Sequence, residues 1–271
     1  LWQSLRHCQK ESIQTALSYI KKPVNENANS CLISLPTGAG KSGVISIVSH
    51  KATQKRVLVL CHRRAVCDQL FKEIDGKFFS DRVEGEVIKR KTVYSDVNDT
   101  SKNGVYVSTF QKLQTFDSNQ LERLKQDIDL IIIDEGHAEP SPVWSTLVRG
   151  IDAHKVVITA TPYRNDLYQF DVTEDASYIY TFKRALADGV LKEPTFEQIF
   201  LAELSGKITQ FLEANEGTKC IIKCEKFEDI NRFYYLLNDD FSVLAIHEQF
   251  TKDERDNVKV SVSANLKGSD Y

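Results

Sequence analysis

The sequence lacks methionine altogether, even at position 1, although a soluble chain of 271 residues would ordinarily carry several. It also lacks any internal repeat and any low-complexity segment. The absence of methionine indicates that modified residues or loops are missing from this sequence. We therefore expect it to be part of a longer chain that continues past position 271.

No apolar run approaches the roughly 18 residues that a membrane-spanning helix needs, and the first residues lack the pattern of a secretory signal. The cysteines show no paired zinc spacing, and we expect those at 220 and 224 to be core thiols rather than metal ligands. Together these absences predict a reduced, cytoplasmic or otherwise intracellular protein without a membrane partner, located in the nucleus if the source is eukaryotic.

The formal net charge of −3 provides no global basic field, so any contact with nucleic acid has to be local. Hydrophobic residues make up 41% of the chain, which is enough for a sizeable core. The length suits one large domain or two smaller ones.

A glycine-rich turn lies between an apolar segment at 31–35, typical of a buried strand, and a predicted helix at 41–51. The glycines allow close approach to a ligand, and the amides at the helix N-terminus point at phosphates. Lys41 would reach the β- and γ-phosphates, and the Ser42 hydroxyl would join a magnesium shell. The general G-x-x-x-x-G-K-[ST] pattern is broken only at Leu35, where glycine is usual.

A second apolar segment, 128–133, ends in two carboxylates, Asp134 and Glu135, with His137 close behind. Open α/β sheets bind ligands at the carboxyl ends of their strands. Asp134 is suited to hold magnesium through water, and Glu135 to polarise the attacking water. His137 could couple the state of the nucleotide to a neighbouring motif. With the glycine-rich turn, this pair predicts hydrolysis of a nucleoside triphosphate.

These two elements belong to an ordered set of short motifs, which lie at residues 5–9, 35–42, 59–64, 107–111, 134–137 and 159–164. In this order the chain resembles a superfamily two helicase or translocase of the DEAD/DEAH-like kind. It is most similar in character to the motor subunits of restriction enzymes. The resemblance runs from one end of the chain to the other.

The resemblance implies that the cofactors are ATP and Mg²⁺, with Gln9 reading the adenine base. The residues expected to bind the nucleotide are Arg6, Gln9, Pro36, Thr37, Gly38, Ala39, Gly40, Lys41, Ser42, Gly268 and Asp270. Those expected to be catalytic are Lys41, Asp134, Glu135 and His137. Ser42 and Asp134 are the expected magnesium ligands.

The resemblance also implies a nucleic-acid partner, with DNA favoured over RNA, and leaves open nuclease, methyltransferase or other subunits. Amides at the start of a helix near Arg63, together with Ser108 and Thr109, can hold backbone phosphates without reading the base sequence. Arg63 and Arg64 are candidate contacts, with solvated surface charge as the alternative.

Two threonines, Thr159 and Thr161, follow another predicted strand at 156–158. Their hydroxyls could link the acidic residues to a second domain. A local hydrogen bond within the turn is an equally good interpretation of either threonine.

Strands and helices alternate through residue 160, which predicts an α/β fold with a parallel sheet flanked by helices. We expect a RecA-like ATP-binding domain at 1–180, an interdomain connection at 181–193 that includes a helix at 182–187, and a partial second RecA-like domain at 194–271. In that second domain we predict a helix at 227–237. We predict its strands at 218–223, 242–246 and 258–262.

The distance from His247 to the last predicted strand is shorter than the family fold would need. The family's sixth motif, which carries arginine fingers, is absent. If that motif is truly missing, this fragment should hydrolyse ATP poorly.

The leading hypothesis is an ATP-dependent nucleic-acid helicase or translocase, possible pathways being restriction or defence, and repair. The alternative is a nucleotide-dependent binding module or scaffold without processive unwinding, against which the intact Lys41, Asp134 and Glu135 argue. A kinase or GTPase would share only the phosphate loop, and the motifs around Gln9 and at 159–164 disfavour it.

Overall fold

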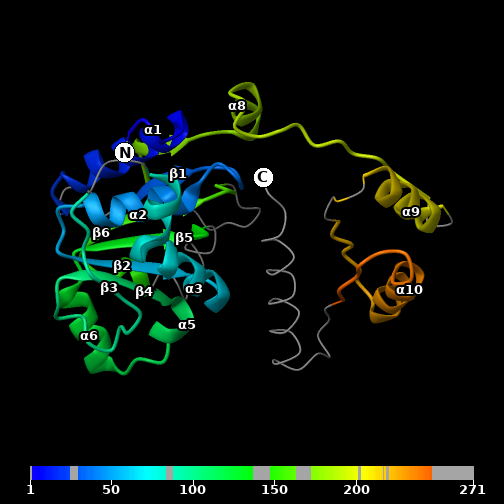
Figure 1. Ribbon diagram of the computed structural model, residues 1–271. Helices are drawn as coiled ribbons and strands as arrows, with labels where there is room; N and C mark the ends of the chain where they lie inside the picture. The colour runs from blue at the N-terminus through cyan, green and yellow to red at the C-terminus, as the bar shows by residue number, and fades with distance from the viewer. Residues whose placement is uncertain are drawn as a thin grey trace. The chain divides into compact units, whose positions relative to one another are not determined.

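A seven-stranded parallel sheet organises the first of two compact units, which divide the chain at residues 193 and 194 (Figure 1). The spatial order of the strands is β3-β4-β2-β5-β6-β1-β7. Their bounds are β1 Ser30–Ser34, β2 Arg56–Cys61, β3 Val93–Tyr94, β4 Gly104–Thr109, β5 Leu130–Asp134, β6 His154–Thr159 and β7 Val172–Ile179. This computed structural model describes residues 2–24, 30–83, 88–136, 147–162, 172–200, 203–215, 217 and 220–245.

Alternate residues of the central strands point into two separate hydrophobic clusters. In β5, Leu130 and Ile132 belong to one cluster, whereas Ile131 and Ile133 belong to the other. Both faces of the sheet are therefore buried, as the continuous apolar sequence of a parallel strand requires. In β5 the only polar side chain, that of Asp134, therefore lies at the end of the strand.

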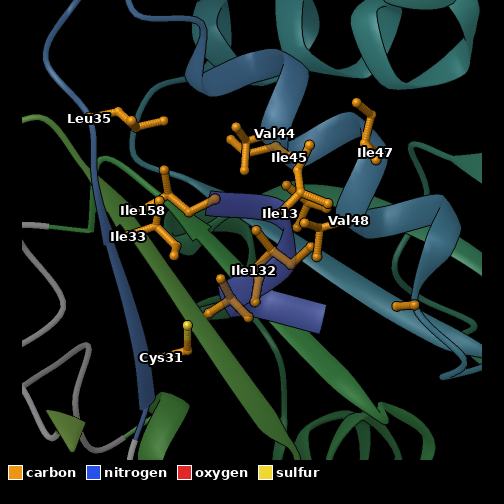
Figure 2. Packing of buried hydrophobic residues seen from close by; sticks show 14 of the residues in the cluster. Ile13, Cys31, Ile33, Leu35, Val44, Ile45, Ile47, Val48, Ile132 and Ile158 are labelled. Atoms are coloured by element: carbon orange, nitrogen blue, oxygen red, sulfur yellow. The ribbon is translucent and has the colours of Figure 1, made fainter. Parts of the chain in front are cut away.

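Helices cover both faces. The first cluster contains residues of α1 (His7–Ile20), α2 (Lys41–Lys51), α3 (Arg64–Lys72), the π-helix η2 (Glu73–Lys77) and α4 (Phe78–Arg82). The second contains residues of α5 (Phe110–Leu113) and α6 (Ser118–Asp127). Figure 2 shows part of the first cluster, which includes Ile13 of α1, Val44 and Val48 of α2, and Ile33 and Ile158 of the sheet.

The expected fold class, a RecA-like parallel sheet flanked by helices, is confirmed. The predicted helix at 41–51 has the bounds of α2. The strand predicted at 128–133 is shifted to 130–134, so that Asp134 is its last residue. The burial pattern therefore places this carboxylate at the end of the strand.

The predicted helix at 182–187 is also confirmed, as α8 (Phe182–Ala187). Its Ala185 is fully buried in the first hydrophobic cluster, and residues 181–193 are counted with the first unit. The division into domains at 1–180, 181–193 and 194–271 stays a prediction.

In the second unit, residues 194–271, the predicted helix at 227–237 is confirmed as α10 (Phe227–Leu237), and α9 (Leu204–Ala214) precedes it. The predicted strands at 218–223 and 242–246 are wrong where they are described, because residues 220–223 and 242–245 have no strand structure. Ile221 is 93% exposed, and a strand requires a neighbour to pair with. The strand predicted at 258–262 lies outside the described residues.

The expectation that Cys220 and Cys224 are core thiols is wrong as well. Cys220 is exposed and Cys224 is only partly buried. Both predictions failed for the same reason, since the expected core position of these thiols depended on the strand between them.

The C-terminal end of α2 is anchored by Lys91 and His50. The Lys91 ammonium donates to the carbonyl oxygens of Ser49 and Ala52, each at 2.7 Å. A cation at a helix C-terminus satisfies carbonyls that have no partner within the helix. Burial lowers the pKa of Lys91 to about 8.

The ring of His50 makes a hydrogen bond at each nitrogen. Its Nδ1 lies 3.1 Å from the backbone nitrogen of Lys91, which donates to it, and its Nε2 lies 2.9 Å from the Ile74 carbonyl oxygen in η2. Since Nδ1 accepts, this arrangement requires the neutral ring with its proton on Nε2. Burial is the main cause that lowers the pKa of His50 below its ordinary value.

Among the described helices, none combines the length and the apolar character that crossing a membrane requires.

We expect acid to destabilise the first unit through His50. Because its pKa is lowered in the folded state, the unfolded chain takes up the proton first as the pH falls. The contribution of His50 to stability is therefore present above the ordinary histidine pKa of about 6.5 and is lost as the pH falls through the lower folded value. One such group changes the free energy of unfolding by at most about 1.4 kcal/mol per pH unit.

Denaturant unfolding at pH 7.5 and pH 5.5 measures this effect. The variant His50→Gln should be less stable than wild type at pH 7.5 and should lose less stability on acidification. His7→Gln, at an exposed position, should keep the wild-type pH dependence. Equal pH dependence in all three proteins would show that His50 is not the responsible group.

Candidate active site

The carboxyl ends of three central strands lie side by side at one edge of the sheet. In the register of the sheet, Ser34 of β1 pairs with Thr159 of β6, and Asp134 of β5 pairs with Ile158 of β6. The loops that follow β1, β5 and β6 therefore start next to one another. The glycine-rich turn, the acidic residues Asp134 and Glu135, and the two threonines that the sequence singled out lie at these strand ends or directly after them.

The glycine-rich turn leads from β1 into α2. The Leu35 amide donates to the Thr159 carbonyl oxygen at 3.0 Å, which ties the start of the turn to β6. Gly38 and Gly40 have φ angles of 87° and 96°, which non-glycine residues rarely adopt. Gly40 is also the N-cap of α2, and no side chain caps the helix there. The N-terminus of α2 thus presents backbone amides at the sheet edge, an arrangement suited to an anion.

Lys41 and Glu135 join the glycine-rich turn to the acidic segment. The Lys41 Nζ lies 3.5 Å from the Glu135 Oε1, and the two side chains are 12% and 38% exposed. Asp134, the residue before Glu135, is buried. Ser42, in the first turn of α2, is partly buried. A cation, two carboxylates and a hydroxyl are therefore grouped at one edge of the sheet.

Glu135 has a φ angle of 51°, the only positive value for a non-glycine residue in the described part of the chain. For residues with a Cβ this left-handed conformation costs roughly 1–2 kcal/mol. Backbone outliers of this kind are concentrated at functional sites. Its conformation therefore marks Glu135 independently of the motif in which it lies.

Two residues at the N-terminal end of α1 contact the glycine-rich turn. The Arg6 Nη1 donates to the Gly38 carbonyl oxygen at 2.6 Å, and the Gln9 Nε2 donates to the Gly40 carbonyl oxygen at 3.1 Å. The Gln9 Oε1 in turn accepts from the Arg6 amide at 3.1 Å. Both ends of the Gln9 amide are thus bonded to backbone in this structure. The base-reading role expected of Gln9 stays a prediction.

A sequence model of the family described as Type III restriction enzyme, res subunit (ResIII) matches residues 3–164, which is more than half of the chain. The chain belongs to the ResIII family. This membership confirms the resemblance to superfamily two helicases, and it makes the chain a helicase-type enzyme that binds nucleotide, hydrolyses ATP and acts on nucleic acid.

Several solved structures are similar to this ResIII chain. A DEAD box protein from Methanococcus jannaschii is 15% identical, with a TM-score of 0.46, over 97% of this chain and 76% of that one. S. cerevisiae Dbp5 bound to RNA and ADP BeF3 is 15% identical, with a TM-score of 0.47, over 97% of this chain and 72% of that one.

A nuclease-deletion mutant of the Type ISP restriction-modification enzyme LlaGI, in complex with a DNA substrate mimic, is 16% identical, with a TM-score of 0.44. That match covers 94% of this chain but only 26% of LlaGI. No curated protein sequence matches the chain.

The two threonines at the end of β6, Thr159 within the strand and Thr161 after it, bond to each other. The Thr161 amide donates to the Thr159 Oγ1 at 3.1 Å, with Thr159 buried and Thr161 exposed. This is the local turn hydrogen bond that was one of the two interpretations of these residues. The coupling role of Thr159 and Thr161 stays a prediction. Of the other predicted site residues, His137, Gly268 and Asp270 lie outside the described residues.

The residues expected to contact nucleic acid lie at the ends of two neighbouring strands. Cys61 of β2 pairs with Thr109 of β4, so the start of α3 lies near the end of β4. Arg63 and Arg64 are exposed, and Ser108 is buried. The Thr109 Oγ1 accepts from the Lys112 amide at 3.2 Å and caps α5.

A pair of thiols lies under this part of the surface. Cys61 and Cys67 are hydrogen-bonded to each other, and this bond with burial raises the pKa of Cys61. The same hydrogen bond lowers the pKa of Cys67. Among the described residues, no group of three or more His, Cys, Asp or Glu side chains is arranged to hold a metal ion.

Sequence motifs did not identify one residue that contacts the glycine-rich turn. Leu191 follows α8, and a Cβ at Gly38 would lie 2.9 Å from its Cδ2. No short motif includes Leu191, and its position depends on a contact across more than 150 residues of sequence. A pattern in the sequence could not have revealed it.

We expect Glu135→Gly to be more stable than Glu135→Ala by about 1 kcal/mol, because only glycine adopts a positive φ without steric cost. Denaturant unfolding of both variants measures the difference. In the interior of α6 the same comparison, Glu122→Gly against Glu122→Ala, should have the opposite sign, since glycine destabilises a helix by about 1 kcal/mol. The same sign at both positions would show that the backbone at Glu135 is not strained.

Proposed function

We propose that the chain is the ATP-hydrolysing motor of a DNA translocase or helicase of the restriction type, with Mg²⁺ as the metal. The observation that carries the proposal is the Lys41–Glu135 pair. Its Nζ and Oε1 atoms lie 3.5 Å apart at the edge of the sheet where the carboxyl ends of β1, β6 and β5 meet. It supports a site in which one phosphate group can meet both a cation and a candidate base. DNA is favoured over RNA because the family is described as a restriction enzyme subunit.

In the proposed mechanism, the amides at the start of α2 bind the phosphates, together with the turn from Pro36 to Gly40. The Lys41 ammonium compensates the charge that develops on the transferring phosphoryl group. When a phosphate takes Lys41 as its partner, Glu135 loses the ion pair and becomes available to orient the attacking water. The ion pair in this structure would then keep both groups in position before ATP binds.

The side chains at the sheet edge fit magnesium. Mg²⁺ is usually bound by one or two protein oxygens together with substrate phosphates and waters, so no cage of carboxylates is needed. Ser42 in the first turn of α2 and Asp134 at the end of β5 offer such oxygens. When bound, the ion would neutralise charge on the β- and γ-phosphate oxygens.

The remaining predicted roles form part of the same proposal. Arg6 and Gln9 would lie beside the nucleotide because they hold the backbone of the turn at Gly38 and Gly40. His137, Gly268 and Asp270 are retained from the family resemblance. Because the family is described as a subunit, nuclease or methyltransferase partners are part of the proposal too.

Contact with DNA would occur at the ends of β2 and β4. Arg63 and Arg64 offer exposed charge there, and helix starts at α3 and α5 offer backbone amides. Contacts of this kind go to phosphates and carry little sequence preference.

The central test compares Lys41→Ala and Glu135→Gln with wild type, in ATP turnover and in equilibrium binding of an ATP analogue. Lys41→Ala should reduce kcat by about 100-fold or more, since a positive charge near the transferring group is removed. Glu135→Gln should reduce kcat similarly while leaving nucleotide affinity within about threefold, because it keeps the size of the side chain and removes only the charge.

Wild-type turnover in Lys41→Ala would refute the site. An affinity loss in Glu135→Gln as large as its rate loss would make Glu135 a binding or structural group instead.

Replacing Arg63 and Arg64 together with alanine should weaken stimulation of ATP turnover by DNA and leave basal turnover nearly unchanged. Loss of two phosphate contacts should also reduce the slope of log affinity against log salt by about 2. The double variant Lys21→Ala with Lys22→Ala is the matched control. It likewise removes two positive charges, at exposed positions directly after α1. These positions lie away from the candidate DNA contacts, because the Lys22 carbonyl contacts His154 at the amino end of β6, whereas Arg63 and Arg64 follow the carboxyl end of β2.

These measurements use single- and double-stranded DNA and RNA of matched length. Stimulation by RNA alone would overturn the preference for DNA. Stimulation by none of them would favour a nucleotide-dependent scaffold. Equal effects of the two double variants would show that Arg63 and Arg64 act only through net charge.

A further inference from the structure

Leu191 packs against the glycine-rich turn from a part of the chain that no motif includes. A Cβ built on Gly38 would meet the Leu191 Cδ2 at 2.9 Å, which is closer than real side-chain contacts allow. The leucine side chain therefore rests directly against the backbone of Gly38. It is partly buried and packs on the first hydrophobic cluster.

The position of Leu191 is fixed by the turn that follows α8. The amides of Val190 and Leu191 both donate to the Ala185 carbonyl oxygen, at 2.9 and 3.0 Å. Ala185 is fully buried, so this turn is attached to the core of the first unit. Leu191 is thus held by backbone hydrogen bonds and does not depend on its own side chain for its location.

A second set of contacts secures the same turn. The hydroxyl of Tyr180, which is buried, donates to the Asp188 Oδ2 at 2.8 Å. The Arg184 guanidinium lies 5.6 Å from the centre of the Tyr180 ring and 3.8 Å from Asp188. Residues 180–191 therefore form an ordered structure whose last residue touches Gly38.

The chain changes character immediately after this contact. Residues 192–198 are exposed, and the second compact unit begins at Pro194. Leu191 is therefore the last partly buried residue before the chain passes into that unit. Arg6 and Gln9 contact the turn from the start of α1. Leu191 contacts it from residues 180–191, the part of the first unit that leads into the second and is here called the segment connecting the two units.

We propose that Leu191 is a positioning residue that couples the conformation of the glycine-rich turn at Gly38 to the segment connecting the two units. This inference rests on the proposed function, because it requires a nucleotide at the turn. Phosphates bound by the turn restrict the Gly38 backbone, and Leu191 transmits this restriction to residues 185–191. In the reverse direction, a pull on the connecting segment reaches Gly38 through the same contact.

Hydrogen exchange of the whole chain tests the first direction, with the backbone amides of residues 190 and 191 as reporters. Their exchange is measured with and without a non-hydrolysable ATP analogue and magnesium. In wild type, nucleotide should slow exchange at both amides at least about threefold. Leu191→Ala should abolish this change although the mutated residue keeps its amide, and Leu191→Met, which preserves the volume, should restore it.

Val190→Ala is the matched control. Val190 is also partly buried against the same cluster and donates to the same carbonyl, but Leu191 is the residue that a Cβ at Gly38 would meet. A purely structural role would make the two alanine variants behave alike. We expect Val190→Ala to keep the nucleotide-dependent protection of wild type.

Steady-state kinetics test the reverse direction. Leu191→Ala should raise the KM for ATP several-fold and remove more than half of the stimulation by DNA, with basal kcat within about twofold of wild type. Val190→Ala should change neither the KM for ATP nor the stimulation by DNA by more than about twofold.

The outcomes separate this inference from the proposed function. If wild type binds no nucleotide, the proposed function fails and the inference falls with it. If wild type binds and hydrolyses ATP, but exchange at residues 190 and 191 does not respond, only the inference fails. Equal effects of Leu191→Ala and Val190→Ala would likewise overturn the inference alone.

Discussion

Burial of the central strands on both faces is the constraint on which the rest of the first unit depends. Because Ile131 and Ile132 of β5 point into different hydrophobic clusters, polar side chains are excluded along the length of the strand. In β5 the first charged residue, Asp134, accordingly lies where the strand ends. Parallel pairing of β6 with β1 and with β5 places the carboxyl ends of these three strands together. The reactive groups therefore meet at this edge although they are far apart in the sequence.

Much of this arrangement was predictable from sequence because it depends on local patterns. Apolar runs identified the strands, and the glycines before Lys41 identified the turn. What could not be predicted depends on partners distant in sequence. The residues at 220–223 look like a strand, but a strand needs a neighbour and Ile221 is exposed. The two backbone contacts of Gln9 and the packing of Leu191 on Gly38 require the folded structure, since neither leaves a pattern in the sequence.

The position of Glu135 illustrates how the site combines order with strain. Its left-handed backbone is unfavourable, yet it follows a strand whose residues are fully buried and whose last carboxylate is nearly so. The favourable burial of β5 can offset the local cost, so the fold keeps Glu135 facing Lys41. A residue selected for stability alone would be glycine or asparagine at such a position. Its identity therefore points to the carboxylate itself as the group that is needed.

The Lys91 and His50 contacts at the far end of α2 have a mechanical consequence. The last carbonyls of α2 are bound to the Lys91 ammonium group, and the His50 ring is hydrogen-bonded at both nitrogens. These contacts fix the C-terminal end of the helix. They oppose a movement of α2 along its axis when a ligand binds at the N-terminal end of the helix. A displacement caused by bound phosphates then has to occur in the turn at 36–40 and in residues 180–191, which contact that turn. The helix then serves as the fixed point against which those parts move.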